Sequence, residues 1–292
     1  MNATKLSRRQ FLGGTAAVAA ASVLPAVAGV APAVAAPSTA VIPDASIKTG
    51  WTPLDPEALA RQAYDLYKGK NSPQQTACCE ATYWPIIGAL ADKFPSSAYA
   101  QIPKGLFNYG GGGVNAWRSI CGCPNGGAAM LKQVGAPGKV IDEYLAWYER
   151  TPFPTNNTYL SAQKGDWTPV VMPKDNAPMA VPNGILCHAS VGRWVEASGG
   201  STGAWAKKHF GGDIVKSSSD RCGKLCFDTV YKLAELINDW MAGAPLPSGA
   251  SDPSVATCLT GGCHGGVYDN VIDDACAPEV LGKMKCDESC HQ

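Results

Sequence analysis

The stretch Ser219-Asp-Arg-Cys222-Gly-Lys-Leu-Cys226-Phe227 opens a segment that predicts a long helix, from about residue 219 to residue 242, closed by Gly243. Cys222 and Cys226 are four residues apart, so on a helix both thiols project from one face toward a common ligand. Helical positions with this spacing usually have poor geometry for a disulfide. The segment therefore favours metal binding by this pair of thiols.

Shorter helices are predicted on the N-terminal side of this segment. Asp55-Pro56-Glu57 is a helix start, with an N-cap, a proline at the first helical position and an acid in the first turn, and Gly69 ends the helix after Lys68. Four further segments are expected to be helical, at about 76–94, 137–149, 185–194 and 202–210. The chain from residue 151 to residue 182 is proline-rich and is expected to be irregular, as a strap or a lid.

The chain also has two glycine-rich runs, Tyr109-Gly-Gly-Gly-Gly113 and Cys121-Gly-Cys123-Pro-Asn-Gly-Gly127, and the second contains two cysteines. Glycines let the backbone approach a cluster closely, and free amides in such a loop can hydrogen-bond to sulfide. Without the cysteines, a plain glycine-rich loop would be the preferred interpretation.

Four thiols are predicted to bind an iron–sulfur cluster: Cys79, Cys123, Cys222 and Cys226. Cys78 and Cys79 lie in the first turn of the predicted 76–94 helix, where the helix dipole lowers the pKa of a thiol and helps it to ligate iron. The sequence does not choose between Cys78 and Cys79, or between Cys121 and Cys123.

Two motifs near the C-terminus predict covalent haem, Cys258-Leu-Thr-Gly-Gly-Cys263-His264 and Cys286-Asp-Glu-Ser-Cys290-His291. In the C-x-x-C-H motif two thiols add to the haem vinyl groups and the adjacent imidazole binds the iron. Here four and three residues separate the thiols. The alternatives are two disulfides, or a zinc site of four thiols and two imidazoles. Two such motifs in one tail favour two haems, with His264 and His291 as axial ligands.

The chain contains four histidines, and two of them belong to these motifs. The other two, His188 and His209, are predicted to be the distal axial ligands, although a methionine could replace either. Histidine on both faces of an iron disfavours substrate binding there and favours outer-sphere electron transfer. The remaining thiols could form disulfides in an oxidising compartment: Cys78, Cys121, Cys187 and Cys276.

The N-terminus has the pattern of a twin-arginine export signal. Ser7-Arg-Arg-Gln-Phe-Leu12 precedes an apolar, Ala- and Gly-rich run from residue 13 to residue 36 that contains small-residue cleavage sites. A membrane-spanning helix is the alternative, but Pro25 and Pro32 interrupt the run. Residues 1–35 are therefore predicted to be a signal peptide that sends an already folded protein to the periplasm. A folded substrate suits a cofactor inserted in the cytoplasm, whereas haem c is attached outside.

The amino-acid composition also fits an exported protein that carries cofactors. The chain has 24 basic and 24 acidic residues, and loss of Lys5, Arg8 and Arg9 with the signal lowers the basic count to 21. The slightly acidic mature protein argues against nucleic-acid binding. Gly and Pro account for 32 and 22 of 292 residues, as expected of a chain that wraps around cofactors. We expect a mainly α fold: a linker at 36–54, a helical iron–sulfur-binding domain at 55–245, and a largely irregular haem c-binding segment at 246–292.

Cys79, then Gly122-Cys123-Pro-Asn-Gly-Gly127, then Cys222 and Cys226 resemble the redox-protein family described by C…GCAxxG…C…C, with Pro124 in place of its alanine. Together with the two tail motifs, residues from about 56 to 292 resemble split-Soret cytochrome c. The resemblance implies a mainly helical subunit with two c-type haems and a 2Fe–2S cluster. It also implies a homodimer in which a histidine of the neighbouring subunit can ligate a haem iron.

The function expected is that of an exported electron-transfer protein that exchanges electrons between its cofactors and redox protein partners, without a permanent membrane span. The alternative is a redox enzyme whose cluster or reactive cysteine meets a substrate, which needs an open iron face or an accessible thiol of low pKa. No acid–base constellation or nucleotide fingerprint supports the enzyme, so the electron carrier is favoured. A disulfide-stapled binding module, which would bind no iron, is a third class.

Overall fold

The structure is a computed structural model that describes residues 53–70, 76–171, 177–200 and 203–245. These belong to the second of two units into which the chain divides, Ala40–Gln292. The predicted signal peptide, nearly all of the predicted linker and the haem-binding segment with both of its motifs lie outside the described residues.

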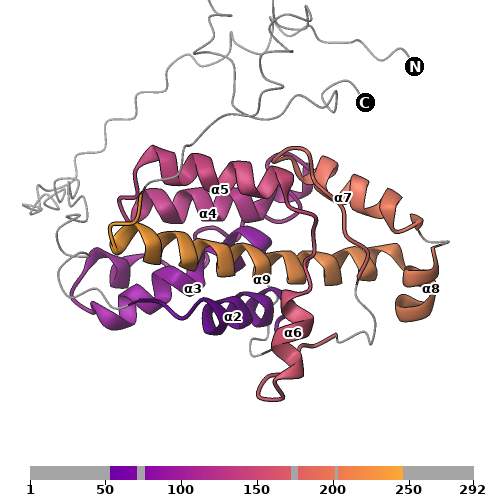
Figure 1. Cartoon of the computed structure of the whole chain (residues 1–292), viewed down its shortest axis with the longest axis horizontal. Helices are drawn as coiled ribbons and strands as arrows, with labels where there is room; N and C mark the ends of the chain where they lie inside the picture. The colour runs from indigo at the N-terminus through magenta and orange to yellow at the C-terminus, as the bar shows by residue number, and fades with distance from the viewer. Residues whose placement is uncertain (1–52, 71–75, 172–176, 201–202, 246–292) are drawn as a thin grey trace, which may run out of the picture. The chain divides into compact units, whose positions relative to one another are not determined.

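The described part is helical and contains no strand, which confirms the mainly α fold (Figure 1). Two isolated antiparallel bridges join Ile120 to Leu186 and Phe153 to Ala180. The α-helices are α2 (Pro56–Lys68), α3 (Cys78–Lys93), α4 (Gly122–Gln133), α5 (Gly138–Arg150), α6 (Asn157–Gln163), α7 (Cys187–Ala197), α8 (Ala204–Phe210) and α9 (Ile214–Met241), with 3-10 turns η1 (Ala98–Gln101) and η2 (Val114–Ala116).

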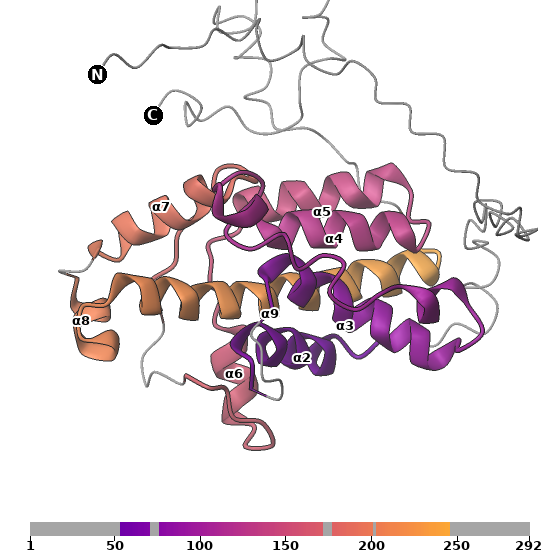
Figure 2. The same cartoon turned by 180° about the vertical axis from the view of Figure 1, so that it is seen from behind.

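Helix α9 is the axis of the bundle. In both views it runs between α4 and α5 on one side and α2 and α3 on the other (Figures 1 and 2). It begins five residues before the predicted start at residue 219, because Asp213 caps it by accepting a hydrogen bond from the amide of Lys216 at 3.0 Å. This length lets one helix present thiols to α3 and α4 while its first turns reach α8.

The start of α2 follows the predicted capping pattern. The Asp55 carboxylate accepts hydrogen bonds from the amides of Glu57 and Ala58 at 3.0 and 3.1 Å. Gly69 ends the helix in the left-handed conformation, with φ of 66°. The predicted helix from residue 56 to Lys68 is thereby confirmed.

The glycine-rich run 121–127 is not a loop. Cys121 is the N-cap of α4 and residues 122–127 form the first half of this helix, so the prediction of a loop here was wrong. Glycines weaken an isolated helix, but α4 needs them because it packs very closely against its neighbours. A Cβ atom at Gly126 would stand 2.3 Å from the carbonyl oxygen of Cys79, and one at Gly127 would stand 2.5 Å from the ring of Tyr144. Tertiary packing here overrides helix propensity.

The proline-rich region 151–182 is also less irregular than predicted, because Asn157–Gln163 forms α6. The segment before it is held to α9. Thr155 donates hydrogen bonds to the carboxylate of Asp228 from its amide at 2.8 Å and from its hydroxyl. The segment around Thr155 is thus fastened to α9.

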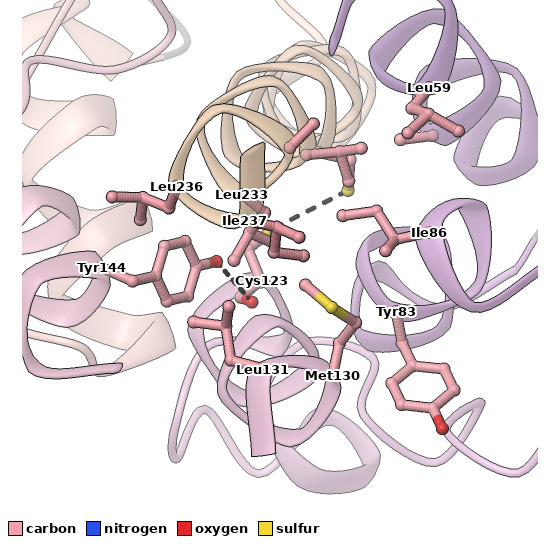
Figure 3. Close-up of a cluster of buried hydrophobic side chains, with 14 of the residues drawn as sticks. Leu59, Tyr83, Ile86, Cys123, Met130, Leu131, Tyr144, Leu233, Leu236 and Ile237 are labelled. Atoms are coloured by element: carbon pink, nitrogen blue, oxygen red, sulfur yellow. Dashed lines mark hydrogen bonds between the residues drawn. The ribbon is translucent and has the colours of Figure 1, made fainter. Parts of the chain in front are cut away.

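One apolar core joins α2, α3, α4, α5 and α9. Figure 3 shows Cys123 inside this core, surrounded by apolar side chains such as Met130 and Ile237, with the hydroxyl of Tyr144 donating to the Cys123 carbonyl at 2.9 Å. Cysteine therefore occupies the centre of the fold and not its edge. Among the described helices, none is both long and apolar enough to cross a membrane.

Candidate metal centre

Seven cysteines fall within the described residues, all as free thiols. Six of them gather where the N-terminal ends of α3, α4 and α7 meet the side of α9: Cys78, Cys121, Cys123, Cys187, Cys222 and Cys226. Of these six, only Cys222 is partly exposed. The structure thus brings three of the four predicted cluster ligands together, namely Cys123, Cys222 and Cys226.

One pair of thiols joins α4 to α9. The sulfur atoms of Cys123 and Cys226 lie 3.7 Å apart. Two thiolates bound to one tetrahedral metal with metal–sulfur bonds of about 2.3 Å lie roughly 3.8 Å apart, so this pair has the spacing of two ligands on one metal atom. Burial, followed by a hydrogen-bond interaction with Cys123 that acts the other way, leaves the pKa of Cys226 raised to about 11.

Cys78 of α3 lies within electrostatic range of Cys222 of α9. Burial raises the pKa of Cys78 to about 12, and the next largest cause is the neighbouring Cys222. The thiol of Cys78 donates to the carbonyl oxygen of Gly110 at 3.5 Å, and the sulfur of Cys226 lies 4.0 Å from the carbonyl oxygen of Cys78. Among the described residues, no three or more His, Cys, Asp or Glu side chains are already arranged to hold a single metal ion.

Cys79, expected from the sequence to be a ligand, does not lie with the other thiols. Burial and the carboxylate of Glu80 raise the pKa of Cys79 to about 12, and no other described thiol contributes. Its side chain packs instead against Gly110, where an added Cβ would stand 2.3 Å from the Cys79 Cβ. Successive helical residues point about 100° apart, so only one of two adjacent cysteines can face α9. That residue is Cys78.

Cys121 and Cys187 flank these thiols on the α7 side. The amide of Cys121 donates to the carbonyl of Ile185 at 2.8 Å and that of Cys187 to Ser119 at 2.7 Å, on either side of the 120–186 bridge. The neighbouring Cys123 and Cys187 both influence the pKa of the Cys121 thiol, which is raised. Both Cys121 and Cys123 are therefore near the centre of the thiol group.

Glycine makes this approach possible. A Cβ atom at Gly122 would stand 2.3 Å from the carbonyl oxygen of Gly110, 2.6 Å from the amide nitrogen of Cys79 and 2.8 Å from the sulfur of Cys78. These separations are shorter than van der Waals contact, and two of the three atoms belong to backbone that cannot turn aside. The N-terminus of α4 reaches the thiols of α3 only because residue 122 has no side chain.

A buried polar network lies beside the thiols. The hydroxyl of Ser190 accepts hydrogen bonds from Arg221 Nη2 at 2.7 Å and from the hydroxyl of Tyr148 at 2.9 Å. Arg221 is 1% exposed, and its Nε and Nη1 groups have no hydrogen-bond partner among the described residues. A buried guanidinium with unused donors beside free thiols fits a site that holds a negatively charged group.

The two histidines outside the haem motifs lie in different surroundings. His188, the second residue of α7, is exposed, and its Nδ1 lies 3.4 Å from the carbonyl oxygen of Arg118. His209, on α8, packs its ring against Trp205 with the ring centroids 4.2 Å apart, and its Nε2 atom is buried. His188 is thus the more accessible of the two to a haem iron.

Comparison with known proteins identifies the family. Residues 5–25 match the model of the TAT (twin-arginine translocation) pathway signal sequence. A split-Soret cytochrome c from Desulfovibrio desulfuricans (strain ATCC 27774 / DSM 6949 / MB) is 30% identical over 234 residues, which cover 74% of this chain and 70% of the relative. The chain belongs to the split-Soret cytochrome c family. The resemblance noted in the sequence is thereby confirmed.

A solved structure of split-Soret cytochrome c from Desulfovibrio desulfuricans ATCC 27774, described as containing a novel iron centre, has a similar fold. It matches with a TM-score of 0.58 and 26% identity, over 83% of this chain and 90% of the other. As a member of a cytochrome c family with a twin-arginine signal, the protein is an electron-transfer protein exported to the periplasm by the twin-arginine route. These parts of the expected function are confirmed.

Proposed function

We propose that this protein carries two c-type haems and one 2Fe–2S cluster, and that it passes electrons between these cofactors and redox protein partners in the periplasm. The observation that carries the proposal is the group of thiols on α3, α4 and α9, in which the sulfur atoms of Cys123 and Cys226 lie 3.7 Å apart. The cluster ligands proposed are Cys78, Cys123, Cys222 and Cys226.

Ligation by two pairs of these thiols would suit a two-iron cluster. Four cysteine thiolates hold the common iron–sulfur clusters, and in a two-iron cluster each iron takes two of them. Cys123 with Cys226 and Cys78 with Cys222 would supply these two pairs from three helices. When bound, the cluster accepts and donates single electrons. The protein positions the thiols, excludes water with its apolar core and supplies amide donors from the start of α4.

The raised thiol pKa values also suit a metal site. Thiols must lose their protons to bind metal, and burial alone makes that loss unfavourable. A group of buried thiols close together is therefore poorly ionised by itself, and iron stabilises the thiolates. The same property disfavours the rival enzyme, because burial raises the pKa of Cys78 and Cys79 to about 12 and leaves them poor nucleophiles at neutral pH.

The haems are proposed to be attached through the two C-terminal motifs. Cys258 with Cys263 and Cys286 with Cys290 would form the covalent links, and His264 and His291 would bind the irons from one side. We propose residues 246–292 as the haem-binding segment, after the iron–sulfur domain at 55–245.

His188 and His209 are the proposed distal ligands. His188 is exposed at the start of α7 and can meet a haem without rearrangement. His209 can do so only if its ring leaves the stack on Trp205. A homodimer, in which such a histidine serves the haem of the other subunit, is part of the same proposal.

The test is to replace one ligand on α9 and measure both cofactors. Cys222→Ser in the full, natively exported chain should abolish acid-labile sulfide but leave covalent haem intact, because the haem motifs lie elsewhere in the sequence. Acid-labile sulfide, iron and intact mass should be measured on the same preparations. Unchanged sulfide in the Cys222→Ser protein would show that the cluster assignment is wrong.

A further inference from the structure

Arg221 carries a buried positive charge that no negatively charged side chain of the described residues balances. Arg221 is 1% exposed, yet within the described part of the chain only one of its three nitrogen groups, Nη2, has a hydrogen-bond acceptor, the neutral hydroxyl of Ser190. Burying a charge without a counter-charge costs several kcal/mol. A stable fold that keeps this arginine therefore needs an anionic group next to it.

No carboxylate serves this purpose among the described residues. Arg221 forms no ion pair with Asp or Glu there, and its Nε and Nη1 groups remain without an acceptor. Asp228 is close enough to respond to its charge, but the oxygens of Asp228 accept hydrogen bonds from Thr155. The missing anion has to come from another kind of group.

The groups that do face Arg221 are thiols and a phenol. Burial lowers the pKa of Arg221, but Cys222, Tyr148 and Cys121 together raise it above its ordinary value. Tyr148 donates to the same Ser190 hydroxyl as Arg221. The neutral hydroxyl of Ser190 therefore holds Arg221 at the edge of the thiol group. The Nε and Nη1 groups of Arg221 remain available to donate hydrogen bonds to sulfur.

We propose that Arg221 is the fixed counter-charge of the iron–sulfur centre: its unused N–H groups donate to sulfur atoms of the centre and raise its reduction potential. The inference rests on the proposed cluster and adds a positioning and tuning residue to it. Four thiolates around an iron–sulfide core carry net negative charge, which increases by one on reduction. A nearby buried cation stabilises the reduced form more than the oxidised form, and hydrogen bonds to sulfur act in the same direction.

The experiment compares charge-changing variants in the full, exported protein. Arg221→Met removes the charge at similar length, and Arg221→Lys keeps it without the planar fork. Lys216→Met on the same helix is the matched control, because Lys216 is exposed and forms its ion pair with Asp213, at 3.2 Å, in its own turn. For each protein the midpoint potential of the cluster is followed by electron paramagnetic resonance, and that of the haems by visible absorption.

Arg221→Met should lower the equilibrium constant for one-electron reduction of the cluster at least tenfold, which is about 59 mV. Arg221→Lys should keep most of the wild-type potential, and Lys216→Met all of it. A cluster potential in Arg221→Met equal to that of the wild type would overturn the proposal.

Loss of the cluster from the Met variant alone, with retention in the Lys variant, would support a requirement for the charge. Loss of the cluster from both Arg221 variants, while Lys216→Met keeps its full cluster content, would show that Arg221 is needed for folding. That result would overturn the proposal. Absence of acid-labile sulfide from the wild-type protein would instead show that the proposed cluster, on which this inference rests, is wrong.

Discussion

The sulfur atoms of Cys123 and Cys226 lie 3.7 Å apart within the apolar core, although 103 residues separate them in the sequence. They connect α4 to the central helix α9 at the point where the aliphatic and aromatic side chains of the core also meet. The candidate metal centre and the centre of the fold are therefore the same place. Metal bound there would add to the stability of the bundle, since unfolding would disperse the ligands.

Adjacent cysteines provide a matched test of the ligand set. Cys78→Ser should remove acid-labile sulfide from the purified protein, because Cys78 lies with the other thiols. Cys79→Ser should retain it, because the Cys79 side chain packs against Gly110. Sulfide and non-haem iron would be measured on both variants. Loss of sulfide from the Cys79 variant alone would restore the ligand set expected from the sequence.

Glycine 122 is predicted to be indispensable for the close packing of α4. Gly122→Ala places a methyl group 2.3 Å from the carbonyl oxygen of Gly110 and should destabilise the fold by roughly 1 to 3 kcal/mol or more. Gly192→Ala, in α7, is the control, since nothing lies within 4 Å of its added Cβ. That variant should gain roughly 0.5 to 1 kcal/mol from helix propensity. Denaturant unfolding of both variants measures the difference, and equal effects would refute the steric explanation.

The free energy of unfolding should decrease as the pH rises from about 4 to about 7, because of the buried carboxyl of Asp228. Burial raises the pKa of this carboxyl from 3.8 to about 7, against the opposing effects of Thr155, Arg221 and Lys224. The folded state thus keeps a proton that the unfolded state has lost, so rising pH favours unfolding until the folded-state pKa is passed. Three pKa units correspond to at most roughly 4 kcal/mol.

Asp228→Asn tests this origin directly. The amide retains hydrogen-bonding capacity toward Thr155 but cannot titrate. Unfolding free energies at pH 5 and pH 8 should differ less in this variant than in the wild type. An undiminished difference would place the pH dependence in other groups, of which Asp220 is one, since burial raises its pKa too.

Histidine substitutions should open the haem irons. His188→Ala should convert one haem to high spin or let it bind carbon monoxide without loss of covalent haem, because it removes an exposed distal ligand. His209→Ala should do the same to the other haem, provided that the ring leaves Trp205 in the assembled protein. Electron paramagnetic resonance and carbon monoxide difference spectra are the measurements. If the haems of both variants stay low-spin and bind no carbon monoxide, the result would point to methionine as the distal ligand.

The sequence predicted much of this fold because several helices carry their own boundary signals. Asp55-Pro56 and Gly69 define α2, and the i, i+4 spacing of Cys222 and Cys226 placed both on one face of a helix. The family motif also singled out Cys123, which the structure places at the centre of the thiol group.

Other features depend on packing, which the sequence does not display. The first half of α4 has the composition of a loop but is helical, and its glycines are needed because α3 and α5 lie close enough to exclude side chains at Gly126 and Gly127. The choice of Cys78 over Cys79 depends on the rotation of α3 about its axis. Arg221 was not singled out, although a basic residue directly before Cys222 was a visible signal.

The most direct test of the central claim is cofactor analysis of the wild-type protein, exported by its own signal from a host that attaches haem c. Intact mass, total iron, acid-labile sulfide and visible spectra of the oxidised and reduced forms should be taken from one preparation. We predict the mass of the mature chain plus two haems, and two non-haem irons with two labile sulfides per chain. The mass of the bare polypeptide, or covalent haem without any labile sulfide, would contradict the account.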